Sequence, residues 1–172
     1  MMKTETLSAS LLLVVLSLLS IQLLDDGWGF IQNLNLIIHE AGHLFFTGAN
    51  EQLMIFMGSG LEFLVPVIFL GYFIYTNQTL GILFSGWWTG TALVHIGYYV
   101  SDAISQSLPL LGGKHVIHDW SYLLVSWGMI GYTDTIGSLI IYLGYFLIAS
   151  SLFLILLIII ESHKKSKLPR TN

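Results

Sequence analysis

The chain has 172 residues, of which 55% are hydrophobic and only 9% are charged, and its formal net charge is −4. A soluble domain carries about 25% charged residues, so this chain has too few charges to cover itself with a solvated surface. The slightly acidic balance gives no indication of a nucleic-acid partner. The absence of cysteine excludes disulfides and thiolate metal sites, so any metal must be bound by histidine and carboxylate groups.

Long apolar runs separated by short polar turns organise the whole chain. A helix needs about 20 apolar residues to cross a bilayer, and most of the runs have that length. The sequence therefore predicts an all-α fold, a polytopic membrane bundle of about six helices that forms one integral-membrane domain, residues 1–172. The predicted spans are Leu7–Leu24, Phe30–Gly48, Leu53–Tyr75, Leu80–Val100, Trp120–Gly131 and Thr135–Ile160. Trp120–Gly131 is the shortest run, which leaves five crossings as the alternative.

A short basic tail, residues 162–172, follows the last predicted span. It holds four of the six basic residues, Lys164, Lys165, Lys167 and Arg170. Positive residues accumulate on the cytoplasmic side of membrane helices, so we expect a cytoplasmic C-terminus. Six crossings place the N-terminus on the same side. The chain is therefore expected to be a multi-pass protein, of the kind found in a bacterial inner membrane.

The second predicted span contains His39-Glu40-Ala41-Gly42-His43, which reads H-E-x-x-H. Residues four apart lie on one face of a helix, so the two imidazoles can bind one Zn²⁺ ion. Glu40 then lies beside the metal, where it can take a proton from a zinc-bound water. Ionisable residues inside a membrane span cost about 2.5–3.5 kcal/mol each, and three of them in five residues favour a functional metal site with Glu40 as the catalytic base.

A catalytic zinc site has a third protein ligand, and the sequence offers two candidates. Asp102 follows the fourth predicted span, and His118 precedes the fifth. His118 is also a candidate donor to the oxyanion, while Asp119 next to it is expected to cap a helix. Because successive spans alternate in direction, these helix ends and the H-E-x-x-H converge at one membrane face, which six crossings place on the cytoplasmic side.

Two more ionisable residues lie inside predicted spans. Glu62 follows Gly58-Ser59-Gly60, which is expected to interrupt its helix. Such a break either exposes backbone groups that pair with a substrate strand or lets Glu62 reach the membrane interface. His95 lies two turns before Asp102 and is expected to be a hydrogen-bonded interior histidine.

With these residues in view, the chain resembles the site-2-protease class of intramembrane zinc metalloproteases. It is more closely similar to small bacterial multi-pass proteins grouped with that class. The motifs behind the closer likeness are His39–His43, Gly58-Ser59-Gly60 with Pro66, Asp102-Ala103, Leu108–Gly113 and His118-Asp119-Trp120. In site-2 proteases both motif histidines and an aspartate from a later helix bind zinc, and the glutamate is the general base. The resemblance implies these roles for His39, His43 and Glu40, and it matches Asp102 only in part.

The function predicted from the sequence is hydrolysis of a peptide bond in a membrane protein or membrane-associated peptide, within the lipid bilayer. Zinc would be held by His39, His43 and either Asp102 or His118. Two other classes remain open at this point. One is a metal transporter or zinc-stabilised scaffold without proteolytic activity, and the other is a zinc hydrolase that acts on lipid.

Overall fold

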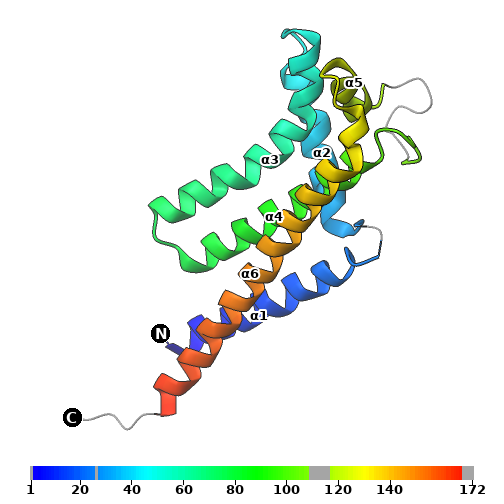
Figure 1. Cartoon of the computed structure of the whole chain (residues 1–172). Helices are drawn as coiled ribbons and strands as arrows, with labels where there is room; N and C mark the ends of the chain where they lie inside the picture. The colour runs from blue at the N-terminus through cyan, green and yellow to red at the C-terminus, as the bar shows by residue number, and fades with distance from the viewer. Residues whose placement is uncertain (1, 26, 109–116, 168–172) are drawn as a thin grey trace.

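The computed structural model describes residues 2–25, 27–108 and 117–167 (Figure 1). The described residues form helices and no strand, which confirms the all-α prediction. Residues 109–116, which include His115 and most of the Leu108–Gly113 motif, lie outside the described part. In chain order the elements are α1 (Met2–Ile21), α2 (Phe30–Phe45), α3 (Glu51–Tyr75), α4 (Thr79–Ser101), α5 (Asp119–Ser126), the 3₁₀ turn η2 (Ile130–Tyr132) and α6 (Thr133–Lys167).

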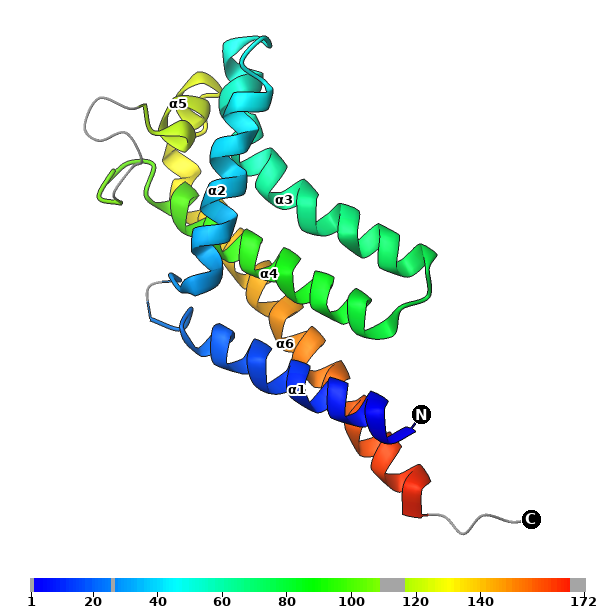
Figure 2. The ribbon, with the colours of Figure 1, turned by 180° about the vertical axis from the view of Figure 1, so that it is seen from behind.

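Helix α6 is the longest element, and α4 and α1 pack along it. Its 35 residues span about 52 Å at 1.5 Å per residue. Helix α4 lies along its first half and α1 along its second half, while α3 pairs with α4 as a hairpin and α2 packs on α3 (Figures 1 and 2). Both termini lie at one end of the molecule, and α5 lies at the other.

The contact between α4 and α6 depends on paired glycines. A Cβ atom added to Gly90 would lie 2.7 Å from the carbonyl oxygen of Gly144, and the reverse substitution gives the same distance. Gly97 and Gly137 form a second such pair, at 2.9 Å in both directions. Small residues at facing positions let helix backbones approach closely, which is the packing typical of membrane helices.

Helix α5 corrects the predicted number of crossings. It has eight residues, about 12 Å of helix, which is less than half the thickness of a bilayer core. Trp120–Gly131 is therefore not a membrane span, and at most five of the six α-helices can cross. Because α6 starts beside α5 and runs to the C-terminus, the H-E-x-x-H end and the basic tail lie at opposite ends of the molecule (Figure 1). The structure thus does not bring the two together at one end, as a shared membrane side would require.

Two further boundaries differ from those predicted. Helix α3 is continuous through Gly58-Ser59-Gly60, so the expected break with free backbone groups is absent. Its first turn is capped by Asn50, whose side chain accepts a hydrogen bond of 2.9 Å from the Leu53 amide. At the other end of the chain, α6 continues to Lys167, so the first part of the predicted tail is helical.

Many large apolar side chains lie on the outside of the helices and several polar ones lie inside, which is the reverse of a soluble bundle. By length and composition, α3 and the run Ile130–Ser166 are long and apolar enough to cross a membrane. Large apolar side chains are exposed along these helices and along α1 and α2. The inward face of α2, in contrast, is polar: Gln32 and Asn35 are fully buried and His39 is 3% exposed.

Candidate metal centre

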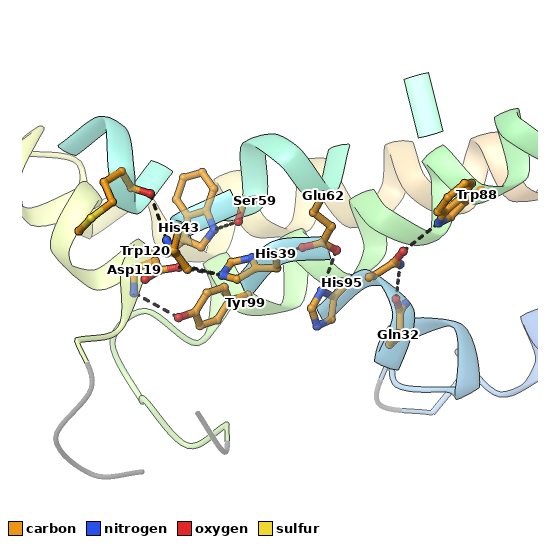
Figure 3. Close-up of polar contacts among 12 residues, drawn as sticks. Gln32, His39, His43, Ser59, Glu62, Trp88, His95, Tyr99, Asp119 and Trp120 are labelled. Carbon is orange, nitrogen blue, oxygen red and sulfur yellow. Dashed lines mark hydrogen bonds and ion pairs between the residues drawn. The ribbon is translucent and has the colours of Figure 1, made fainter. Parts of the chain in front are cut away.

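His39 and His43 lie in the C-terminal half of α2 and point toward the same space. Their Nε2 atoms are 3.1 Å apart, and the two rings meet edge to face (Figure 3). The helical repeat brings them together, as their spacing of four residues predicts. His39 is buried and His43 is half-buried.

The third group is Asp119, from the first turn of α5. Its Oδ2 atom lies 2.9 Å from His39 Nε2 and 3.0 Å from His43 Nε2. Four ligands at 2.0–2.1 Å from a tetrahedral ion are about 3.3 Å apart, so this triangle needs only a small expansion to surround a metal. Among the described residues, His39, His43 and Asp119 form the group that could hold a metal ion.

Each imidazole has its second nitrogen directed at an acceptor. His43 Nδ1 lies 3.0 Å from the carbonyl oxygen of Met54, and His39 Nδ1 lies 3.4 Å from Glu62 Oε2. A proton on Nδ1 leaves the Nε2 lone pair free, and such contacts fix the tautomer and orientation of metal-binding histidines. The side chains are therefore arranged so that both Nε2 atoms can act as ligands.

Glycine at position 58 makes room for the two rings. A Cβ atom there would lie 2.6 Å from His43 Nε2 and 2.7 Å from His39 Nε2, closer than side chains approach. The Gly-Ser-Gly sequence thus serves close packing of α3 against the imidazoles.

We expect Gly58→Ala to reduce metal affinity about tenfold or more, because the added methyl group forces the rings out of their converging positions. Bound zinc after dialysis of the purified protein measures the effect. Gly71→Ala on the same helix is the matched control, since nothing lies within 4 Å of its added Cβ. Equal zinc content in the two variants would show that the space at Gly58 is not needed.

Helix α5 is held in place by hydrogen bonds with α3 and α4. The Asp119 amide donates to Tyr99 Oη at 3.2 Å, and Trp120 Nε1 donates to Ser59 Oγ at 3.0 Å. Tyr122 Oη donates to a carboxylate oxygen of Glu51 at 2.9 Å. An apolar cluster that includes Trp120 lies beneath the helix. Burial opposes ionisation of Asp119, but its bonds to the two imidazoles outweigh that and lower its pKa, so the carboxylate is available as an anionic ligand.

Asp102 and His118, the two residues predicted as third ligand, do not belong to this group. Asp102 ends α4, where its carboxylate accepts bonds from the Ser105 and Ser107 hydroxyls and from the Ser107 and Leu108 amides. His118 is the N-cap of α5: its Nδ1 accepts from the Ser121 amide at 3.3 Å, and its Nε2 lies 3.4 Å from Asp102 Oδ2. His118 Nδ1 thus caps the helix, while its Nε2 is buried without a hydrogen-bond partner among the described residues. Its predicted role as oxyanion donor stays a prediction.

We expect Asp102→Asn to destabilise the protein by about 1 kcal/mol at pH 7, after allowance for solvent screening. Burial opposes ionisation, but the hydrogen bonds from Ser105, Leu108 and Ser107 lower the pKa of Asp102 to about 2, below its ordinary value of 3.8. The stabilisation is therefore complete above about pH 4 and is lost as the pH falls toward 2. Thermal unfolding of both proteins across this range should show their difference in Tm shrinking. A difference that is independent of pH would contradict the assignment.

Glu40, the predicted general base, lies between the two histidines in sequence and is exposed. The Tyr99 ring packs against His39 with centroids 5.6 Å apart. Glu40 does not belong to the group of His39, His43 and Asp119 that could hold a metal ion.

His95 has the role predicted for it, and Glu62 does not. His95 is 8% exposed and its Nδ1 lies 2.7 Å from Glu62 Oε1, so it is a hydrogen-bonded interior histidine. Glu62 is fully buried and does not reach an interface. Sequence reasoning also missed Asp119 as a candidate ligand, because it was expected to be the cap of α5. The true cap is the preceding residue, His118, which moves Asp119 into the first helical turn.

Comparison with known proteins gives no relative whose site could be compared with this centre. No family model, no curated protein and no solved structure matches the chain. The resemblance to site-2 proteases therefore remains a prediction that rests on the motif and on the arrangement of residues around it.

Proposed function

We propose that the protein is an integral membrane zinc metalloprotease that hydrolyses a peptide bond of a membrane-associated substrate. The observation that carries the proposal is the triangle of His39 Nε2, His43 Nε2 and Asp119 Oδ2, with sides of 2.9–3.1 Å. Two imidazoles and one carboxylate are a donor set that zinc accepts while keeping one position open. The aspartate comes from a later helix, as the resemblance to site-2 proteases implies for the third ligand.

Membrane insertion is supported by the outer surface of the helices. Exposed apolar patches larger than a few hundred Å² are rare on soluble monomers, and here large apolar side chains are exposed on α1, α2, α3 and α6. We infer that α3, α4 and α6 cross the bilayer, together with α1. The basic residues at the end of α6 then face the cytoplasm. The metal centre lies near the opposite face of the membrane, because α6 leads from one to the other.

The proposed chemistry uses the chain's own residues in simple roles. His39, His43 and Asp119 would hold the zinc ion, which supplies Lewis acidity that lowers the pKa of a water molecule toward about 7. Glu40 accepts the proton of the attacking water and returns it to the leaving amine. Its exposure gives both water and substrate access to the carboxylate.

The test is incubation of the purified protein with a panel of membrane peptides and of lipids, with and without a chelator. Cleavage of peptides that stops on chelation and returns with zinc supports the proposal. Cleavage of lipid alone would indicate the lipid-hydrolase alternative. Metal flux in proteoliposomes, or zinc-dependent stability without turnover of any substrate, would indicate the transporter or scaffold alternative and would contradict the protease.

A further inference from the structure

Behind the metal centre lies a buried carboxylate that the proposed reaction does not use. Glu62 projects from α3 and is 0% exposed. Its two oxygens face two histidines from different helices: Oε1 is 2.7 Å from His95 Nδ1, and Oε2 is 3.4 Å from His39 Nδ1 (Figure 3). The carboxylate therefore joins α2, α3 and α4 at one point, directly next to a ligand.

The contact with His39 is the part of this arrangement that points to a metal. His39 Nδ1 and Glu62 Oε2 are both buried, and neither has a hydrogen-bond partner among the described residues. They face each other at slightly more than hydrogen-bond distance. The triangle must expand slightly to surround an ion, and this expansion rotates the His39 imidazole. A small rotation of that kind can close the gap between Nδ1 and Oε2. The Nδ1 proton would then be donated to Glu62, and the Nε2 lone pair would be directed at the ion.

The charges lead to the same conclusion. Two neutral imidazoles and one carboxylate around a divalent ion leave a net charge of +1 in an apolar interior. The carboxylate of Glu62 cancels that charge. Buried charges are tolerated when they are paired, so Glu62 and the loaded metal centre compensate each other. His95 can be a neutral imidazole that donates from Nδ1, and it fixes the carboxylate without changing the balance.

We propose that Glu62 is a positioning residue for the metal centre: it accepts the Nδ1 proton of His39 and balances the charge of the bound ion, and His95 holds it in place. This inference rests on the metal centre of the proposed function, but not on the reaction carried out there. It assigns to the buried Glu62–His95 pair a role in metal affinity instead of a role in substrate binding.

The experiment measures zinc affinity of the full chain in detergent by competition with a chromophoric chelator. Residues that contact metal ligands in this way typically contribute 10–100-fold to affinity, so we expect that loss in Glu62→Gln and a smaller loss in His95→Phe. Glu161→Gln is the matched control, because it makes the same change at an exposed carboxylate near the other end of the molecule, where its partner is Lys165. It should bind zinc like the wild type.

A second readout separates positioning from a purely structural role. Zinc raises the Tm by an amount that grows with the logarithm of its affinity, so the rise should shrink in Glu62→Gln while the Tm of the metal-free protein is maintained. Equal zinc affinity of Glu62→Gln and wild type would overturn the inference, as would equal loss of Tm with and without zinc. If Glu62→Gln does not fold, wild-type affinity in both Glu62→Asp and His95→Phe would overturn it. A wild type that binds no zinc would instead overturn the proposed function itself.

Discussion

Replacing Asp119 should abolish tight metal binding, whereas replacing Asp102 should not. Asp119→Asn keeps the size of the side chain but removes the anionic ligand that lies within 3.0 Å of both imidazoles. We expect zinc affinity to fall by more than about a hundredfold, which is the upper range for residues that only touch ligands. Peptide cleavage should fall with it. Metal analysis after dialysis, together with the chelator competition, measures both the occupancy and the affinity.

Asp102→Ala and His118→Ala are the matched controls for this result. Both side chains lie in the same region and were candidate ligands by sequence, but their partners are loop amides, hydroxyls and each other. Each variant should lose thermal stability and keep its zinc in the folded fraction isolated by gel filtration. Zinc retained in Asp119→Asn but lost in Asp102→Ala would transfer the ligand role to Asp102 and contradict the geometry described above.

Glu40→Gln should separate binding from turnover. Glu40 lies outside the triangle, so the variant is expected to bind zinc with wild-type affinity. A general base contributes about 10²–10⁴-fold to rate, and we expect peptide cleavage to fall by that factor, with little change in KM. Time courses with the best peptide of the panel and metal analysis of the same preparation measure the two quantities.

Glu161→Gln serves as the control for Glu40→Gln. It is the same change at an exposed glutamate near the other end of the molecule, where its partner is Lys165. Its cleavage rate should equal that of the wild type. If Glu40→Gln cleaved at the wild-type rate, the general-base assignment would be wrong, and a role of the centre in transport or stability would become the better interpretation.

The part of the site that could be predicted from sequence is the part that local geometry determines. His39 and His43 share a helix face because of the α-helical repeat, and no other element is needed to bring them together. The all-helical fold follows in the same way from the length of the apolar runs. His95 was predictable because a polar ring inside a long apolar run must find a partner.

The third ligand depends on tertiary structure and could not be read in this way. Asp119 lies 80 residues from His39 along the chain and reaches it because α5 is short and packs on α3. Asp102 and Asp119 both stand at the boundary of an apolar run, so their sequence surroundings are alike. Their structural positions distinguish them. Asp102 follows the last turn of α4 and binds the loop after it, whereas Asp119 lies in the first turn of α5 and contacts the histidines of α2.

The surroundings of Glu62 also depend on tertiary contacts that the sequence does not reveal. A glutamate behind two glycines was expected to mark a broken helix, because glycine is a poor helix former. In the structure Gly58 is required by the imidazoles in front of it, and the helix continues. A rule about backbone preference was overridden by a close contact with another helix, which sequence spacing alone does not reveal.

The paired glycines of α4 and α6 would restrict how a substrate of the proposed protease can approach. Where each backbone carbonyl lies under 3 Å from the Cβ position of the opposing glycine, no acyl chain or peptide can slip between the two helices. A substrate of the proposed protease would therefore reach Glu40 by another route, and larger side chains at these glycines would force the two helices apart.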